Sequence, residues 1–167
     1  MLARDPQART PPADGPDGVS HFGDNREMVP TIAFSESVDG VDWRALKAAL
    51  AADDFDNGRT PDEYETSHRN SFGAVFAIDG DRYVGNARIL SDGVCNAYVV
   101  DVWTATAYRR RGIGSELVRR MLARVRDQHV YLFTDDMAEF YRRLGFSVQP
   151  DGMGMVVGSW LSRDPRP

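Results

Sequence analysis

The residues best suited to a chemical role form a short run of arginines and glycines that precedes an amphipathic segment. Arg109, Arg110 and Arg111 come directly before Gly112-Ile113-Gly114-Ser115, and the residues that follow have the apolar spacing of a helix. Glycines in the first turn of a helix leave its backbone N–H groups uncovered, and the partial positive charge there favours phosphate groups. The arginines add full positive charges. The run therefore predicts a site for a phosphate or a diphosphate.

Two common nucleotide-binding motifs do not fit this run. A dinucleotide-binding fingerprint requires a third glycine, where this chain has Leu117, and a parallel βαβ unit. A P-loop requires Gly-Lys-Ser or Gly-Lys-Thr, and the run holds no lysine. The strands expected before the run are antiparallel, which also disagrees with a βαβ unit. On the residues alone, a basic turn exposed to solvent stays open as the alternative.

The spacing Arg109-x-x-Gly112-x-Gly114 after a strand resembles the coenzyme-binding signature of the GNAT superfamily of N-acetyltransferases. A second run, Ala138-Glu139-Phe140-Tyr141-Arg142-Arg143-Leu144-Gly145-Phe146, is similar to the other hallmark of that family. The resemblance implies the GNAT fold, a mixed α/β (α+β) fold with a mostly antiparallel, splayed central sheet of about six to seven strands and about four helices. It also implies direct transfer of an acetyl group from acetyl-coenzyme A to an amine.

By this resemblance, the coenzyme contacts a strand end, the basic turn and the short helix after the fifth strand. Backbone N–H groups of residues 102–104 are expected to meet the oxyanion at a β-bulge, and those of residues 109–115 the diphosphate. The full set of expected coenzyme-binding residues is Val102, Trp103, Thr104, Arg109, Arg110, Arg111, Gly112, Ile113, Gly114, Ser115, Thr134 and Tyr141. Tyr141 is also expected to be catalytic, because a tyrosine, with an ordinary pKa near ~10, can protonate the leaving thiolate.

Asp101 is the second expected catalytic residue, and its role stays open between three interpretations. It lies beside Trp103, near the place that the resemblance gives to the acetyl group. It accepts the amine proton through a water, holds a cationic substrate by its charge, or is a structural carboxylate. Arg88, on a preceding strand, is a candidate partner for an ion pair across the sheet.

A narrower resemblance involves the strands before the basic turn. The run Val84 to Gly93, followed by Asn96-Ala97 and Asp101-Val102, is similar to the chloroplast-type arylalkylamine (serotonin) and protein acetyltransferases of plants and to their bacterial relatives. This resemblance leads us to expect substrate-side roles for Arg59, Asn70, Ser71, Arg88 and Asn96. The chain departs from the pattern at Thr60 and Thr106, which leaves the acceptor's identity open.

Composition and charge favour some classes of protein over others. With 167 residues, of which 42% are hydrophobic and 27% charged, the chain resembles an ordinary globular domain. Its net charge of −5 disfavours nucleic-acid binding, which usually requires a basic excess. A single cysteine, and no apolar run near the ~18 residues that cross a bilayer, predict a cytoplasmic protein without a membrane partner. The histidines lack metal-ligand spacing, so we expect no metal site.

The expected partners follow from the resemblance and from one acidic stretch. They are acetyl-coenzyme A as co-substrate, an amine acceptor and a second copy of the chain in a homodimer. The acidic cluster from Asp53 to Glu65 suggests a cationic acceptor, although a solvated helix end explains it as well. A domain that binds acyl-coenzyme A as a sensor, without catalysis, is the alternative function.

Proline, glycine and hydrophobic periodicity divide the chain into parts and predict its elements. Residues 1–28 are expected to form a flexible extension, residues 29–162 the acetyltransferase domain, and residues 163–167 a tail. The predicted elements are a strand at 31–35, a helix at 43–50 capped by Asp42, a helix at 61–70, strands at 74–78, 83–90 and 96–104, a helix at 113–125, a strand at 130–134, a short helix with a capping box of Asp136 and Glu139 that ends at Gly145, and closing strands around Val148 and at 153–160. A two-residue turn of Asp79-Gly80 is expected to join two of the strands.

Overall fold

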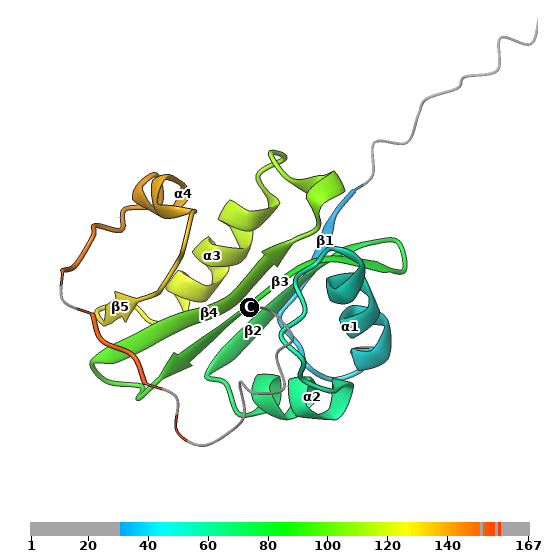
Figure 1. The fold of residues 1–167 in the computed structure, drawn as a ribbon, viewed down its shortest axis with the longest axis horizontal. Coiled ribbons are helices and arrows are strands. Elements are labelled where there is room, and N and C mark those ends of the chain that lie inside the picture. The colour runs from blue at the N-terminus through cyan, green and yellow to red at the C-terminus, as the bar shows by residue number, and fades with distance from the viewer. Residues whose placement is uncertain (1–30, 151, 156, 158–167) are drawn as a thin grey trace, which may run out of the picture.

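The computed structural model describes residues 31–150, 152–155 and 157, which form a central sheet covered by helices (Figure 1). In chain order the elements are β1 (Ala33–Ser35), α1 (Trp43–Ala52), α2 (Pro61–Arg69), β2 (Gly73–Asp79), β3 (Arg82–Ser91), β4 (Asn96–Thr104), the 3₁₀ helix η1 (Thr106–Tyr108), α3 (Ile113–Ala123), β5 (His129–Tyr131) and α4 (Ala138–Arg142). The fold is of the mixed α/β type that the sequence predicts. The expected extension at 1–28 and tail at 163–167 lie outside the described residues.

The strands of the described part lie in sequence order, β1-β2-β3-β4-β5. β1 to β4 pair antiparallel, whereas β5 runs parallel to β4 and pairs only with Asn96, Ala97 and Tyr98. From there to Thr104, β4 has no second strand beside it within the described residues. The sheet is therefore splayed along the second half of β4, the half that leads into the basic turn.

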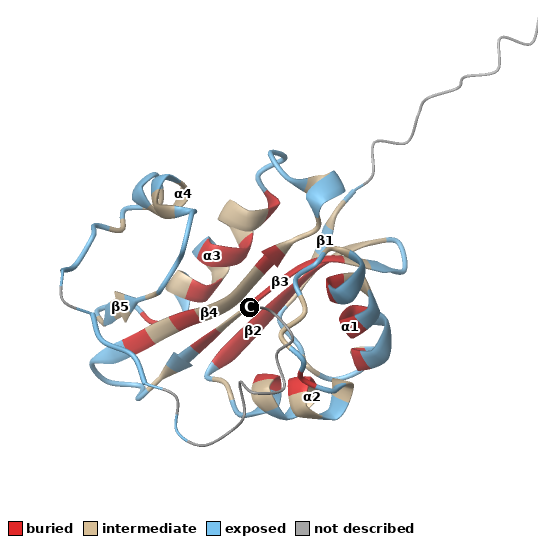
Figure 2. Cartoon of the chain, in the orientation of Figure 1, coloured by how far each residue is buried: buried red, intermediate tan, exposed pale blue. Residues whose placement is uncertain are grey.

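Helices cover both faces of the sheet, and this explains why β2 and β3 are the most buried strands (Figure 2). α3 packs against one face, where Leu117 lies in the same core cluster as Val75. α1 and α2 pack against the other face, where Trp43 and Tyr64 cluster with Phe76. Successive side chains of a strand point to opposite faces, so a strand between two helical layers must be apolar on both sides.

The starts of the first two helices follow from their sequences. Asp42 accepts hydrogen bonds from the backbone N–H groups of Arg44 and Ala45, which confirms the predicted cap of α1. Thr60 and Glu63 form a capping box at α2. The sequence holds this pattern, Thr-x-x-Glu, but the prediction treated Thr60 only as a departure from a family pattern.

The region between β5 and α4 differs from the sequence prediction. β5 ends at Tyr131, so Thr134 lies in the following loop instead of in a strand. The capping box predicted from Asp136 and Glu139 is wrong, because Met137 is the N-cap residue of α4 and no side chain caps this helix. The hydroxyl of Thr134 instead accepts a hydrogen bond from the Met137 N–H at 3.1 Å, which fixes the chain in a different approach to the helix.

Two turns and the C-terminal segment complete the comparison with the prediction. Asp79 pairs with Arg82, so the hairpin turn consists of residues 80–81 and lies one residue later than predicted. Gly145 has a φ of 96° after α4, as predicted for the end of that helix. The described residues after β5 contain no strand, although closing strands were predicted around Val148 and at 153–160, a stretch partly outside the described residues. The described sheet therefore has five strands, fewer than the six to seven expected.

The described residues contain neither a helix suited to crossing a membrane nor a cluster of metal-binding side chains. None of their helices combines the length and the apolar character that a membrane crossing requires. No group of three or more His, Cys, Asp and Glu residues among them is placed to hold a metal ion. Cys95 is a free, exposed thiol.

Candidate active site

The backbone of the basic turn presents N–H groups at the start of α3. Arg110 and Gly112 both adopt positive φ, of 65° and 83°, and Gly112 is an N-cap residue that provides no side-chain hydrogen bond. The N–H of Glu116 donates to the carbonyl of Gly112, so the N–H groups of residues 113–115 precede the hydrogen-bonded part of the helix. Such N–H groups, together with the partial positive charge of a helix N-terminus, suit a phosphate group.

The arginines of the turn have different surroundings. Arg109 donates from Nε to a backbone carbonyl at the end of β4 at 3.1 Å, and its Nη2 lies 3.5 Å from the carboxylate of Asp53. Arg111 lies over the ring of Tyr108, 5.1 Å from its centre. Arg110 is exposed and forms no hydrogen bond or ion pair within the described residues. Arg109 therefore braces the turn, whereas Arg110 is available to pair with an anion.

Gly114 lies where β4, α3 and α4 approach one another closely. A Cβ atom at this position would lie 3.2 Å from Oγ1 of Thr104 and 3.5 Å from the ring of Phe140. The first distance is tighter than nine in ten real Cβ contacts, so a larger side chain would push these elements apart. The second glycine of the motif thus allows α4, which carries Tyr141, to pack against the start of α3.

A bulge interrupts β4 before it reaches the basic turn. The pairing moves from Asn86 to Arg88 along β3 and from Trp103 to Val100 along β4, so β4 contains one residue more. Asp101 lies in this bulge with a φ of 53°, which is unusual for a residue with a side chain. The resemblance predicts a bulge next to residues 102–104, and the structure contains one there.

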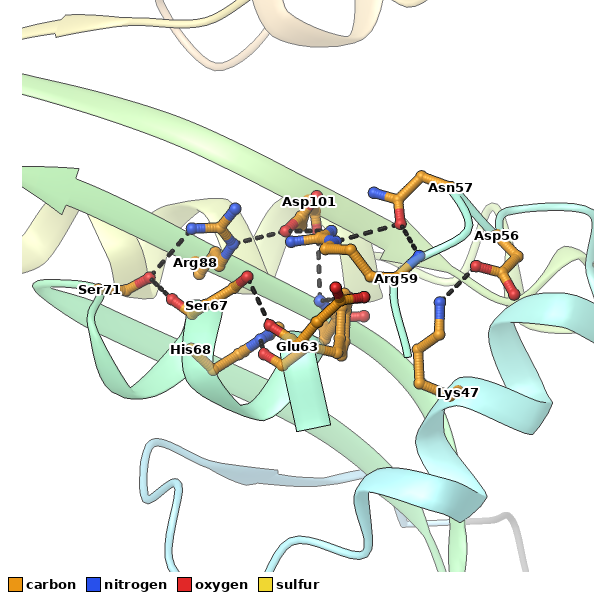
Figure 3. Close-up of polar contacts among 12 residues, drawn as sticks. Lys47, Asp56, Asn57, Arg59, Glu63, Ser67, His68, Ser71, Arg88 and Asp101 are labelled. Carbon is orange, nitrogen blue, oxygen red and sulfur yellow. Dashed lines mark hydrogen bonds and ion pairs between the residues drawn. The ribbon is translucent and has the colours of Figure 1, made fainter. Parts of the chain in front are cut away.

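The carboxylate of Asp101 forms ion pairs with two arginines from distant parts of the chain (Figure 3). Arg88 of β3 donates from Nε at 2.5 Å, and Arg59 of the loop before α2 donates from Nη2 at 2.8 Å. The exposed fractions of the side chains are only 15% for Asp101, 13% for Arg88 and 9% for Arg59. The pair with Arg88 confirms one of the alternatives that the sequence left open. No sequence pattern indicated that Arg59 joins it.

The two arginines keep Asp101 ionised. Burial by itself would raise the pKa of this carboxyl, but the charges and hydrogen bonds of Arg88 and Arg59 outweigh burial and lower the pKa below 3.8. Asp101 is therefore a carboxylate and a weak base at neutral pH. It lacks the raised pKa that suits a group for removing a proton from an amine near pH 7.

Buried polar residues extend this network beneath the bulge. Asn86 is fully buried and donates from Nδ2 to the hydroxyl of Tyr64 and to the backbone carbonyl of Asp101, each at 3.0 Å. The guanidinium of Arg59 also lies over the ring of Tyr64, 4.6 Å from the ring centre. Both residues were missed by the sequence prediction. Asn86 lies within the run that resembles the plant acetyltransferases, and this was the one signal that pointed to it.

His68 lies in the aromatic core beside this network. Its Nδ1 is 2.8 Å from the carbonyl of Tyr64, and its ring stacks on Phe76. Burial lowers the pKa of His68 to about 4, so the ring is neutral at neutral pH. Its Nε2 has no hydrogen-bond partner within the described residues. These contacts describe a core residue.

The other residues expected on the substrate side lie in different places. Ser71 accepts a hydrogen bond from Nη1 of Arg88 at 3.2 Å, so it belongs to the network. Asn70 is the exposed C-cap residue of α2. Asn96 begins β4, which puts it ~16 Å from Asp101 along the strand at ~3.3 Å per residue. The structure therefore brings Ser71, but not Asn96, to Asp101.

Tyr141 lies on α4 as a half-buried phenol. Its ring packs edge-on against Phe140 and Phe146. Burial raises its pKa above 10.0, so the hydroxyl is protonated at neutral pH. No hydrogen bond within the described residues uses this hydroxyl, which leaves it free to donate to a ligand.

The fold and the site define an α/β protein in which a helix start suited to a phosphate group lies beside an opened sheet. The chain matches the family model of the acetyltransferase (GNAT) family over residues 42–146. The protein therefore belongs to the GNAT acetyltransferase family, whose members transfer an acyl group from acetyl-coenzyme A to an amine. The matched range contains both the basic turn and Tyr141.

Relatives in plants agree with this family. Histone acetyltransferase TAP1 of Glycine max is 34% identical over 76 residues, which cover 43% of this chain and 33% of that protein. GCN5-related N-acetyltransferase 2, chloroplastic, of Arabidopsis thaliana is 32% identical over 76 residues, which cover 43% of this chain and 30% of that protein. The matched segment thus spans only about a third of each of these relatives.

Solved structures show the same fold over most of the chain. A GNAT-family acetyltransferase from Streptococcus pneumoniae is 28% identical, with a TM-score of 0.63, and the match covers 76% of this chain and 97% of that one. Glucosamine-6-phosphate N-acetyltransferase from Arabidopsis thaliana is 13% identical, with a TM-score of 0.60 and coverage of 77% and 99%. The second likeness is one of fold alone.

Proposed function

We propose that this protein is an acetyl-coenzyme A-dependent N-acetyltransferase that transfers the acetyl group directly to a primary amine, on a small molecule or a lysine side chain. The observation that carries the proposal is the uncapped start of α3 beside the splayed half of β4. N–H groups of residues 113–115 suit the diphosphate of the coenzyme. Space around Gly112 supports this fit, because no atom lies within 4 Å of the place where its Cβ would be.

The residues divide the chemistry among them as follows. The bound coenzyme supplies an acetyl thioester, which an amine attacks as its free base. We assign stabilisation of the oxyanion to backbone N–H groups of residues 102–104, since a bulge releases strand N–H groups from the ladder. Tyr141 supplies the proton that the leaving thiolate requires, because its raised pKa keeps the phenol protonated.

We assign Asp101 the role of a fixed negative charge instead of a general base. Its lowered pKa gives it little affinity for a proton near pH 7. Both arginines donate to its Oδ2, and its Oδ1 accepts no hydrogen bond within the described residues, so Oδ1 can receive the amine or a water. The amine then loses its proton to solvent, and the rate follows the fraction of acceptor that is unprotonated.

The acidic stretch gives little support to a cationic acceptor. Asp53 accepts hydrogen bonds from Trp103 and Thr106, and Asp56 forms an ion pair with Lys47. The protein itself therefore occupies Asp53 and Asp56, two of the carboxylates that the sequence offered to a substrate. The choice of acceptor must come from other residues, and the network around Asp101 is the nearest candidate.

The experiment that tests the proposal measures release of the coenzyme A thiol from acetyl-coenzyme A with a panel of amines, with products identified by mass spectrometry. The panel contains arylalkylamines, polyamines and lysine peptides, including histone peptides because one relative is named a histone acetyltransferase. Amine-dependent thiol release supports the proposal. Thermal stabilisation by acetyl-coenzyme A without turnover on any acceptor would favour the acyl-coenzyme A-binding sensor instead.

A further inference from the structure

A carboxylate at the end of α1 contacts three points along the approach to the basic turn. Asp53 is the C-cap residue of α1. Its Oδ2 accepts a hydrogen bond from Nε1 of Trp103 at 2.9 Å, and its Oδ1 accepts one from the backbone N–H of Thr106 at 2.9 Å. Oδ2 also lies 3.5 Å from Nη2 of Arg109. One side chain thus joins a helix end to β4, to η1 and to the first residue of the coenzyme motif.

Asp53 makes these contacts as an ionised and largely buried group. Its side chain is 15% exposed. Burial by itself would raise the pKa, but hydrogen bonds from Thr106 and Trp103 and the charge of Arg109 lower it below 3.8. Hydrogen bonds to an ionised acceptor are shorter and stronger than those between neutral groups. Asp53 is therefore a charged anchor, and not the solvated helix end that the sequence alone allowed.

The anchored segment leads directly to the N–H groups of α3. Trp103 is 1% exposed and follows the bulge in β4, and Thr106 begins η1. Arg109, the third contact of Asp53, also donates from Nε to the carbonyl of Thr104 at 3.1 Å. Side-chain hydrogen bonds thus tie the segment at its start, in its middle and at its end, which sets the direction in which the chain enters α3.

The neighbouring acidic residues do not share this arrangement. Asp54 is exposed and its side chain forms no hydrogen bond within the described residues. Asp56 pairs with Lys47 and accepts a hydrogen bond from the N–H of Gly58. Contact with the basic turn is therefore particular to Asp53, and Asp54, one residue away, provides a matched control.

We infer that Asp53 is a positioning residue for the coenzyme: it holds Trp103, Thr106 and Arg109 so that the N–H groups at the start of α3 are aligned before the diphosphate binds. This inference rests on the proposed binding of acetyl-coenzyme A at that helix. Groups that are already ordered lose less conformational freedom on binding. Removal of the anchor therefore weakens coenzyme binding although Asp53 is not assigned a contact with the ligand.

The test titrates acetyl-coenzyme A into the wild type, Asp53→Asn, Asp53→Glu and Asp54→Asn in a calorimeter. Asp53→Asn keeps the shape but places an NH₂ group against a hydrogen-bond donor and removes the charge beside Arg109. Its coenzyme Kd is expected to rise about 10- to 100-fold, while the KM of the acceptor changes little and Asp54→Asn matches the wild type. The NMR signal of the Trp103 indole N–H is assigned with Trp103→Phe. Its chemical shift is expected to change in Asp53→Asn and to stay the same in Asp54→Asn.

The outcomes separate this inference from the proposed function. If the wild type binds acetyl-coenzyme A and Asp53→Asn binds it with the same affinity, the inference is overturned. The proposed function is unaffected by that result. If coenzyme affinity and acceptor affinity fall by similar factors and the melting temperature also falls, Asp53 is merely a structural cap. That result overturns the inference as well. If Asp53→Asn does not fold, Asp53→Glu decides, because it keeps the charge and must still lose coenzyme affinity. A wild type that does not bind acetyl-coenzyme A refutes the proposed function and the inference together.

Discussion

The two sides of the site are built from different kinds of group. On the coenzyme side, the binding groups are backbone N–H groups of one continuous segment, shaped by glycines with positive φ or without room for a side chain. On the other side, Asp101 meets Arg59 and Arg88, which lie 42 and 13 residues away in the sequence. That side depends on buried charges. A backbone site is therefore broken by adding a side chain, and a charge network is broken by removing one.

The largest effect on turnover is expected on the coenzyme side, at Tyr141. Tyr141→Phe removes the proposed proton donor and should lower kcat by about 10²- to 10⁴-fold, while the Kd of acetyl-coenzyme A changes little because the turn is intact. Steady-state kinetics and calorimetry measure the two quantities. Tyr131→Phe, at an exposed tyrosine on β5, is the control and should behave as the wild type. If Tyr141→Phe has the kcat of the wild type, Tyr141 is not the group that protonates the leaving thiolate.

The next largest effect is one of stability, in the charge network. Asp101→Asn leaves two buried guanidinium groups without their carboxylate and should lower the free energy of unfolding by roughly 3 kcal/mol. Urea denaturation measures this loss. Glu65→Gln breaks a more exposed pair, with Arg69, and should cost less than about 1 kcal/mol. Similar losses in the two variants would show that the network around Asp101 contributes no more than a surface ion pair.

A smaller, graded effect of pH is expected at His68, next to that network. The pKa of the folded state, about 4, lies below the value near ~6.5 of an unfolded chain, so the unfolded chain binds the proton first. Stability should therefore fall as pH decreases from about 6.5 to 4, by up to about 1.4 kcal/mol per pH unit. Below that range, protonation of Asp101 through its lowered pKa adds a further loss.

Urea denaturation at several pH values checks this prediction against a variant. His68→Gln removes the titrating ring and should flatten the dependence between pH 6.5 and 4, although it lowers stability at neutral pH by disturbing the core. If the free energy of unfolding of His68→Gln depends on pH between 6.5 and 4 as strongly as that of the wild type, the acid sensitivity belongs to other groups. That result would weaken the contrast between the coenzyme side and the charge network.

The same difference explains how much the sequence could predict. β4 has the predicted bounds, Asn96 to Thr104, and α3 begins at Ile113 as expected, because alternation, turn residues and glycines are local signals. The bulge rested on resemblance alone. The partnership of Arg59 with Asp101 could not be predicted, because it depends on how a loop folds over the sheet.

Local signals also fail where a neighbouring contact sets the backbone path into a helix. Asp136 and Glu139 have the spacing of a capping box, yet the hydroxyl of Thr134 accepts the bond from the Met137 N–H and α4 starts later. At Asp53 the fold creates contacts that no local signal predicts. Its sequence neighbourhood suggests a solvated helix end, and only the fold brings Trp103 and Thr106 to its carboxylate.

The most direct test of the central claim, that the start of α3 binds the coenzyme diphosphate, is calorimetric titration of Gly112→Glu with acetyl-coenzyme A. Gly40→Glu is the matched control, since both glycines have positive φ, of 83° and 77°, and no atom within 4 Å of a Cβ. Both substitutions therefore carry similar backbone strain, but only the first places a carboxylate against the N–H groups of α3. The account predicts loss of measurable binding in Gly112→Glu and wild-type affinity in Gly40→Glu. Wild-type affinity in Gly112→Glu would contradict it.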